Sequence, residues 1–172
     1  MISVNKRLTE AFNTLPLMDL NPEGRPLGFK PTYSWGSELD LNRLAKLANM
    51  DIYPLIHQTS NRSSQNAKER LVEVDLRLVL AVQNRSVEDL NKVRWQTTYE
   101  NILYPLAKNI ETLFLKGSIF IWDGVYDLAE YPNYGNDQSQ DRNKSIDIWD
   151  ALTFETTINI YGSQVCMKPL KY

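Results

Sequence analysis

Alternating apolar and polar positions mark residues 71–83 as a strand. Its even-numbered positions are all apolar between the two ends: Val72, Val74, Leu76, Leu78, Leu80 and Val82. The odd positions of its first half carry the charged residues Glu73, Asp75 and Arg77. A repeat of two residues is that of a strand with one buried face. We therefore predict a long strand whose even side packs against a helix and whose charged side stays at the surface, available to a neighbouring subunit.

A helical repeat follows over residues 86–116. Apolar residues recur there at steps of three or four: Trp95, Tyr99, Ile102, Leu106, Ile110 and Leu113. This spacing predicts a helix of seven or eight turns with one face on a core, beginning at a cap near Ser86 and ending at Gly117. Pro105 lies inside it and removes one backbone hydrogen bond, so we expect a bend near residues 101–104 or a break into two helices.

The first fifty residues predict two short helices separated by an irregular arm. Residues 4–15 and 37–50 carry apolar residues at helical spacing, the second set behind a capping box formed by Ser37 and Asp40. Between them, residues 21–36 contain prolines and glycines at six positions: Pro22, Gly24, Pro26, Gly28, Pro31 and Gly36. So many breakers argue against any regular element, and we interpret this stretch as an arm.

Residues 51–58 have strand character but contain a proline. Pro54 cannot donate to a ladder, so this strand should lie at a sheet edge or hold its proline on an unpaired side. It would pair with the strand 71–83. The connecting residues 59–70 are polar apart from one alanine, and we predict an extended loop that projects from the sheet.

Two further segments complete the predicted sheet. Residues 118–129 predict a strand or a hairpin turning at Asp123 and Gly124, and residues 148–160 predict a long final strand. The helices are segregated beside these strands, so the fold class expected is α+β, with an antiparallel sheet and the long helix packed across one face. We expect residues 1–172 to form a single domain. Such a sheet has two edges, and self-association is a natural way to cover them.

Composition narrows the classes of function. Nineteen Lys and Arg residues against twenty-one Asp and Glu give a net charge of −2, with both signs scattered along the chain, which disfavours general nucleic-acid binding. Cys166 is the single cysteine and excludes an internal disulfide. The first residues lack the apolar core of a signal peptide, and no window reaches the roughly eighteen apolar residues of a membrane span, so we expect an intracellular protein without a membrane association.

Few residues are candidates for chemistry. His57 is the single histidine and has no partner residues in the sequence for a zinc site, so we interpret it as a structural or surface residue. Glu73 and Asp75 lie on one strand face, as do the magnesium-binding carboxylates of several nucleases, although Arg77 is a poor substitute for the lysine that such sites carry. Phosphate-binding, dinucleotide-binding and nucleophile-elbow motifs are missing from the sequence. We expect no cofactor, no metal and no enzymatic activity.

Three features in order resemble a known family. These are the segment Tyr53–Ile56, which reads Tyr-Pro-Leu-Ile, the alternating strand Val72–Val82, and the helix containing Ile-Leu-Tyr-Pro-Leu at residues 102–106. Together they are similar to the tail-terminator or tail-completion proteins of tailed bacteriophages and the related head–tail neck proteins. The similarity covers about residues 50–160 and lies in pattern and order.

The resemblance implies a virion structural protein with no catalytic residues. Its members form a ring at the head–tail neck or tail terminus, joining the connector to the tail. The partners implied are copies of the chain itself, with six and twelve both open, and neighbouring neck, portal-adaptor or tail-tube proteins. DNA would pass through the lumen without specific binding. The protein would be made and assembled in the host bacterial cytoplasm and end in the virion.

Polarity and expected protrusion select the candidate interface residues. They lie in the arm 21–36, the loop 59–70 and the charged strand face: Arg25, Tyr33, Arg62, Arg70, Glu73, Asp75 and Arg77. The aromatic loop near residues 131–146 is a further departure from the simplest family members. Two alternatives stay open, a metal-dependent nuclease using Glu73 and Asp75, and a host-directed protein-binding module using exposed aromatic residues.

Overall fold

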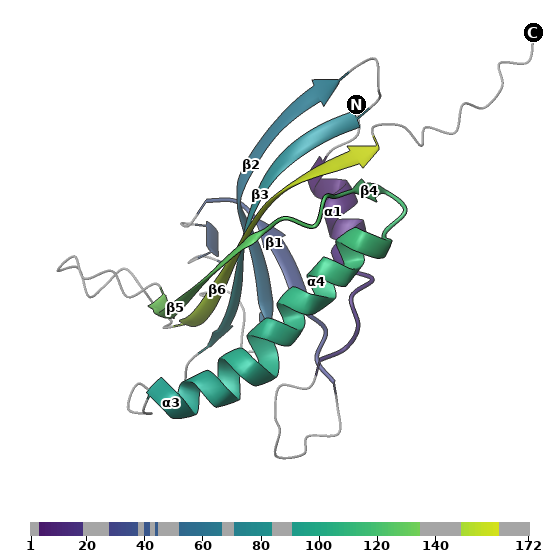
Figure 1. The fold of residues 1–172 in the computed structure, drawn as a ribbon. Coiled ribbons are helices and arrows are strands. Elements are labelled where there is room, and N and C mark those ends of the chain that lie inside the picture. Colours follow the sequence, from purple (N-terminus) through teal and green to yellow (C-terminus); the bar gives the residue numbers. More distant parts are fainter. Residues whose placement is uncertain are drawn as a thin grey trace, which may run out of the picture.

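The chain forms a curled, mostly antiparallel sheet with one long helix lying across it (Figure 1). The computed structural model describes residues 4–18, 28–37, 40–41, 44, 52–66, 71–83, 91–134 and 149–161. The elements in chain order are α1 (Val4–Phe12), β1 (Thr32–Trp35), β2 (Leu55–Asn66), β3 (Leu71–Gln83), α3 (Asn91–Arg94), η2 (Trp95–Leu103), α4 (Tyr104–Lys116), β4 (Phe120–Ile121), β5 (Asp127–Tyr134) and β6 (Trp149–Tyr161).

Strand β3 lies in the middle of the sheet, whose order is β1-β2-β3-β6-β4. It pairs antiparallel with β2 on one side and with β6 on the other, the β6 pairing running from Leu71 opposite Tyr161 to Gln83 opposite Trp149. β1 runs parallel to β2. β4 and β5 both pair with the outer side of β6, one after the other along its length. The long strands predicted at 71–83 and 148–160 are thus confirmed, and the structure shows in addition that they are neighbours.

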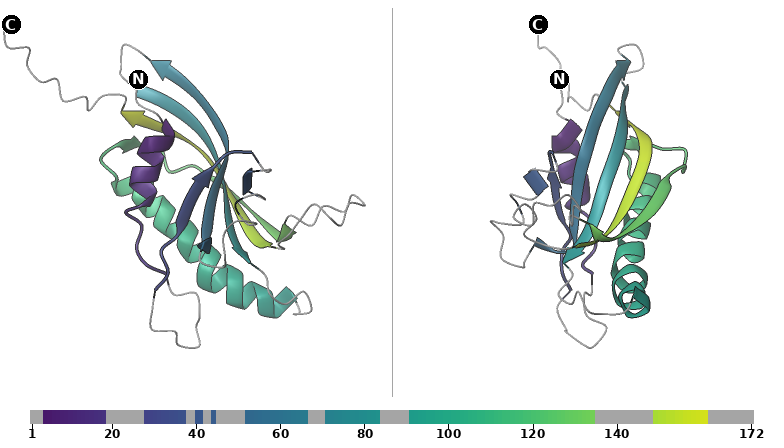
Figure 2. Two further views of the ribbon diagram at one scale, coloured as in Figure 1. Left: turned by 180° about the vertical axis from the view of Figure 1, so that it is seen from behind. Right: turned by 90° about the vertical axis from the view of Figure 1, so that its left-hand side faces the viewer.

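One face of the sheet is covered by helices, and it carries the larger core (Figure 2). The even positions of β3 face this core, as their alternation predicts: those from Val74 to Leu80 are buried, and Val72 and Val82 at the two ends are partly buried. The core is built from three groups of side chains: Val74, Leu76, Leu78 and Leu80 of β3; Leu152, Phe154, Ile158 and Ile160 of β6; and Leu8, Phe12, Leu103, Leu106, Ile110 and Phe114 of the helices. The long helix and α1 therefore share a single apolar layer under the sheet.

A second, smaller core lies on the opposite face, at one end only. Val79 and Ala81 of β3 are buried there with Leu55, Ala151, Trp149, Tyr53 and Leu41. The Trp149 indole Nε1 donates a hydrogen bond of 2.6 Å to the Tyr53 hydroxyl, so this aromatic pair has its polar atoms satisfied. The odd side of β3 is consequently divided: buried at Val79 and Ala81, and open to solvent at Glu73 and Asp75.

The long helix continues through Pro105 without breaking. Over η2 the backbone forms wide π-helical turns, and the Tyr104 N–H donates to the Tyr99 carbonyl five residues earlier. Pro105 then lies in the first turn of α4, directly after these wide turns. The predicted helix is confirmed over residues 91–116, but the expected break is wrong because the change of turn width accommodates the proline. Trp95, expected on the core face, is 40% exposed.

The arm predicted at 21–36 contains a strand. β1 forms at Thr32–Trp35, just beyond Pro31, and pairs with β2 in register Thr32 opposite Leu55. The many prolines and glycines nearby do not indicate this strand. It is only four residues long and forms by pairing with β2, a segment about twenty residues away that the local sequence pattern does not identify. Residues 21–27 lie outside the described part of the chain.

The loop predicted at 59–70 is wrong for residues 59–66, which extend β2. After a bulge between Gln58 and Ser60, the pairing with β3 continues to Asn66 opposite Leu71. A strand of polar residues can form here because its backbone hydrogen bonds to β3 stabilise it, and these bonds do not depend on which side chains it carries. Pro54 precedes β2, and β1 covers that side, so the 51–58 strand is not at the sheet edge as one reading expected.

The capping box at Ser37 and Asp40 is confirmed. The Ser37 N–H donates to Asp40 Oδ2 over 2.8 Å, and the Asp40 N–H donates to the Ser37 hydroxyl over 3.3 Å. Asp40, Leu41 and Leu44 are helical, while most of the predicted helix 37–50 lies outside the described residues.

Residues 118–129 do not form a hairpin. The chain turns at Gly124, whose φ of 83° favours glycine, and the Asp123 side chain accepts the Val125 N–H at 3.0 Å. The strands on either side, β4 and β5, pair with β6 instead of with each other. Thr156 of β6 closes the gap, because its hydroxyl accepts from Trp122 Nε1 and donates to the Val125 carbonyl.

Candidate interaction surface

The open end of the sheet face that lies away from the helices carries a strip of polar side chains in register across three strands, β2, β3 and β6. Asp75 of β3 is opposite Thr157 of β6, whose hydroxyl donates to Asp75 Oδ1 over 2.9 Å. Arg77 is opposite Glu155, with its Nε 3.0 Å from Glu155 Oε1. We call the following residues the open-face strip: Ser64, Glu73, Asp75, Arg77, Glu155 and Thr157.

The open-face strip is acidic and loosely held. Among its described side chains three carboxylates accompany the single cation Arg77, and both members of the Arg77–Glu155 pair are about half exposed. Exposed ion pairs of this kind contribute between zero and about 1 kcal/mol to stability. These side chains are therefore free to exchange their mutual contacts for contacts with a partner at little cost to the fold.

Three of the seven predicted interface residues come together on this strip, namely Glu73, Asp75 and Arg77. The backbone of Arg62 in β2 lies opposite Asp75. Arg25 and Arg70 lie outside the described residues. The interface role of all seven stays a prediction.

Tyr33 lies away from the strip, on β1. Its ring is half-buried, with a centroid 4.7 Å from that of Phe12, and its hydroxyl donates to Gln58 Oε1. Burial raises the pKa of Tyr33 well above its ordinary value. Because the Tyr33 side chain packs largely in the core, the groups of this residue that a partner could bind are those of the backbone.

Among the residues that the structure describes, neither His57 nor the carboxylates are gathered into a metal-binding cluster. In the described part of the chain there is no group of three or more His, Cys, Asp or Glu side chains placed to hold a metal ion. His57 is buried, with Nδ1 2.8 Å from the Ser34 hydroxyl and Nε2 3.3 Å from the Ser37 carbonyl. Since a carbonyl only accepts, Nε2 carries the hydrogen, and the ring links β2 to β1 and to the residue that begins the capping box.

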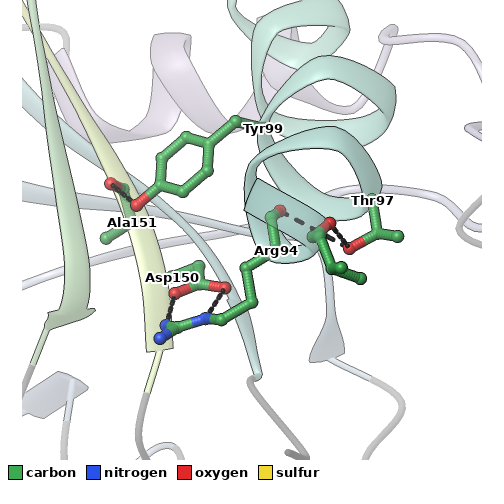
Figure 3. A network of polar contacts seen from close by, with 6 residues as sticks. Arg94, Thr97, Tyr99, Asp150 and Ala151 are labelled. Carbon is green, nitrogen blue, oxygen red and sulfur yellow. Dashed lines mark hydrogen bonds and ion pairs between the residues drawn. The ribbon is translucent and has the colours of Figure 1, made fainter. Parts of the chain in front are cut away.

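A buried ion pair, which sequence reasoning missed, joins the start of the long helix to β6 (Figure 3). The guanidinium of Arg94 binds both carboxylate oxygens of Asp150, and the two residues are 5% and 2% exposed. Nearby, the Tyr99 hydroxyl donates to the Ala151 carbonyl over 3.3 Å. Burial, followed by the charge of Asp150, raises the pKa of Tyr99 well above its ordinary value. A signal was present: Asp150 occupies an even, core-facing position of its strand, where a carboxylate requires a cation.

Glu130 of β5 anchors the same helix from the sheet edge. Its carboxylate accepts hydrogen bonds from Trp95 Nε1, at 3.1 and 3.3 Å, and from the Tyr104 hydroxyl. The bond to Glu130, with burial second, raises the pKa of Tyr104 to about 12. Trp95 is therefore exposed, but its orientation is fixed because its indole N–H donates to Glu130.

This geometry predicts a loss of stability at high pH. A tyrosine whose folded pKa exceeds its unfolded value of about 10 stabilises the fold fully below pH 10 and loses that contribution as the pH rises toward 12. We expect the difference in free energy of unfolding between the wild type and Tyr104→Phe to be constant from pH 7 to 9 and to shrink between pH 10 and 12. Urea unfolding at each pH measures it. A difference that grows over that interval would contradict the assigned bond.

The fold and its surfaces define a mixed α and β protein with a helix-covered sheet, an open acidic strip and two sheet edges. Comparison with protein-family models and with curated proteins finds no match for the sequence. Within the described residues, no helix combines the length and apolar character needed to cross a membrane.

Proposed function

We propose that this protein is a structural component of a tailed-phage virion, forming a ring at the head–tail neck or tail terminus that joins the connector to the tail. The observation that carries the proposal is a sheet that is packed by helices on one face and open at one end of the other face, with polar side chains ordered along that open part. A ring subunit must contact neighbours beside it and rings above or below it. This sheet offers separate surfaces for both.

The order of elements supports the same proposal. The strands β2 and β3 and then the long helix follow one another in the same order as the three features of the resemblance, which covers about residues 50–160. The β2–β3 pair and β6 extend toward one end of the molecule (Figure 1). Ser63 and Ser64 are exposed in this part of β2, and in the proposed assembly they would contact a neighbouring ring.

The charge of the open-face strip suits a channel for DNA. Glu73, Asp75 and Glu155 outnumber Arg77, so a lumen lined by this face would not hold DNA by attraction to its phosphates. Specific DNA binding is not part of the proposed role.

Two measurements test the function. Light scattering coupled to size-exclusion chromatography should give a ring-sized particle for the purified chain, and mass spectrometry of purified virions of the encoding phage should detect the chain at a fixed number of copies. Absence from the particle would overturn the proposal, even if the purified chain forms rings.

Charge reversal on the open-face strip provides a sharper prediction. In a Glu73→Lys, Asp75→Lys variant we expect the yield of infectious phage to fall at least about tenfold, because the strip becomes cationic. It would then repel a cationic surface of a neighbouring ring or, in a lumen, hold the phosphates of the passing DNA. The thermal midpoint should change little, since both side chains are exposed. Glu100→Lys, on the exposed side of the long helix, is the matched control and should leave the yield unchanged. A normal yield from the double variant would remove the strip from the assembly.

A metal-dependent nuclease is the second candidate, favoured by the two carboxylates of Glu73 and Asp75 on one open strand face. It requires magnesium-dependent cleavage of DNA or RNA by the wild type that is lost in Glu73→Ala and in Asp75→Ala. A wild type that cleaves nothing in the presence of magnesium would exclude it.

A further inference from the structure

The two outer edges of the sheet are different strands, and neither is paired within the described residues. β1 lies at one side of the sheet, and β5, with β4, lies at the other (Figure 2). The Thr32 and Gly36 N–H groups donate to β2, so by alternation the backbone groups of Tyr33 and Trp35 point outward. Unpaired strand edges are templates for pairing with another chain.

The two edge strands run in opposite directions. β2 and β6 are both antiparallel to β3, β1 is parallel to β2, and β5 is antiparallel to β6. A second copy placed beside the first without turning its sheet over therefore brings its β1 against β5 in antiparallel orientation. This is the geometry in which strands pair most readily.

The charges beside the two edges are complementary. Asp127 and Glu130 are exposed on β5. On the other side Lys30 is exposed just before β1, and α1, which packs against β1 through Phe12, carries Lys6 and Arg7 against Glu10. Asp40 lies beside Gly36 just after β1, and with it counted this group of described residues is still net positive. Pairing β5 with β5 would oppose acidic residues, so charge favours the pairing of unlike edges.

Apolar side chains are exposed beside both edges as well. On the β5 side Val125 is 68% exposed and Leu128 and Tyr131 are also exposed. On the β1 side Trp35 is 50% exposed, and Leu17 is exposed next to the Met18–Phe29 bridge. Aromatic and large apolar residues inside a rim of charges are typical of the centre of a protein–protein contact.

We propose that the outer edge of β5 in one copy of this chain pairs with the outer edge of β1 in the next copy, as a head-to-tail contact that repeats. Because the two surfaces differ, the contact is heterologous, and it closes into a ring when the rotation between copies allows. The inference rests on the proposed ring and names the surfaces that meet in it. The open-face strip then remains available to the lumen or to another ring.

Complementary charge-reversed variants test this contact. The first variant, Asp127→Lys with Ala129→Lys, makes the β5 edge basic. The second, Lys6→Glu with Lys30→Glu, makes the β1 edge acidic. In sedimentation velocity we expect the wild type to self-associate, and each variant alone to associate at least about tenfold more weakly. An equimolar mixture should recover assembly, because each variant then offers the edge that the other lacks. Glu100→Lys should assemble as the wild type does.

The outcomes separate this inference from the proposed function. Circular dichroism confirms that each variant is folded before its assembly is measured. A monomeric wild type, a variant that assembles normally alone, or a mixture that fails to recover would each overturn the edge contact. Recovery in the mixture, together with absence of the chain from virions, would uphold the contact and overturn the neck role.

Discussion

Replacing Arg94 with alanine is expected to lower the free energy of unfolding by about 3–5 kcal/mol. The substitution leaves the Asp150 carboxylate 2% exposed and without the guanidinium that now binds both its oxygens. A buried charge without its partner is costly because water cannot replace the lost hydrogen bonds. The substitution also removes the ion pair that links the start of the long helix to β6. Urea unfolding followed by far-ultraviolet circular dichroism at pH 7 measures the loss.

Two further variants show whether the cost arises from the unpaired charge. In Arg94→Met with Asp150→Leu both charges are gone, and we expect most of the stability to return, since apolar residues of similar volume can replace a buried pair. Arg77→Ala breaks the exposed pair with Glu155 and should cost less than about 1 kcal/mol. If the double variant were as unstable as Arg94→Ala, the ion pair would not be the source of the loss.

The sequence predicts the centre of the sheet well because its pattern is local. The alternation in residues 71–83 and 148–160 requires knowledge of no other segment, and both strands lie where expected. β1 and the second half of β2 behave differently. Each is held mainly by backbone pairing to a strand elsewhere in the chain, and neither prolines nearby nor a polar composition reveals such pairing.

The candidate surface could be predicted only in part for the same reason. The spacing of Glu73, Asp75 and Arg77 places them on one strand face, and they do share it. Thr157 and Glu155, which contact them, come from a strand about eighty residues later, and only the register between β3 and β6 identifies them. A pattern based on 3.6 residues per turn also cannot reveal the wider turns of η2. The pattern therefore predicts Trp95 on the core face, whereas it is exposed.

Phe114 holds the helices to the sheet, and Phe114→Ala is expected to cost about 3–5 kcal/mol of stability. Its ring lies within 5.1 to 6.3 Å, between centroids, of those of Phe12, Phe120, Trp122 and Phe154, which come from α1, from β4 and the residue after it, and from β6. Truncation would remove all four contacts and leave a cavity between α4, α1 and β6, because these neighbours are themselves packed and cannot collapse fully. Thermal and urea unfolding measure the change.

The next residue along the same helix is the matched control. Leu115 is 58% exposed, and alanine is at least as favourable as leucine in a helix, so Leu115→Ala should stay within about 0.5 kcal/mol of the wild type. Two truncations one residue apart then separate burial from helix propensity. Equal losses at the two positions would mean that α4 does not present Phe114 to the sheet. A large loss at Phe114 alone would establish that the contacts of its ring with Phe12, Phe120, Trp122 and Phe154 hold the long helix against the sheet. That sheet carries the open-face strip and both outer edges.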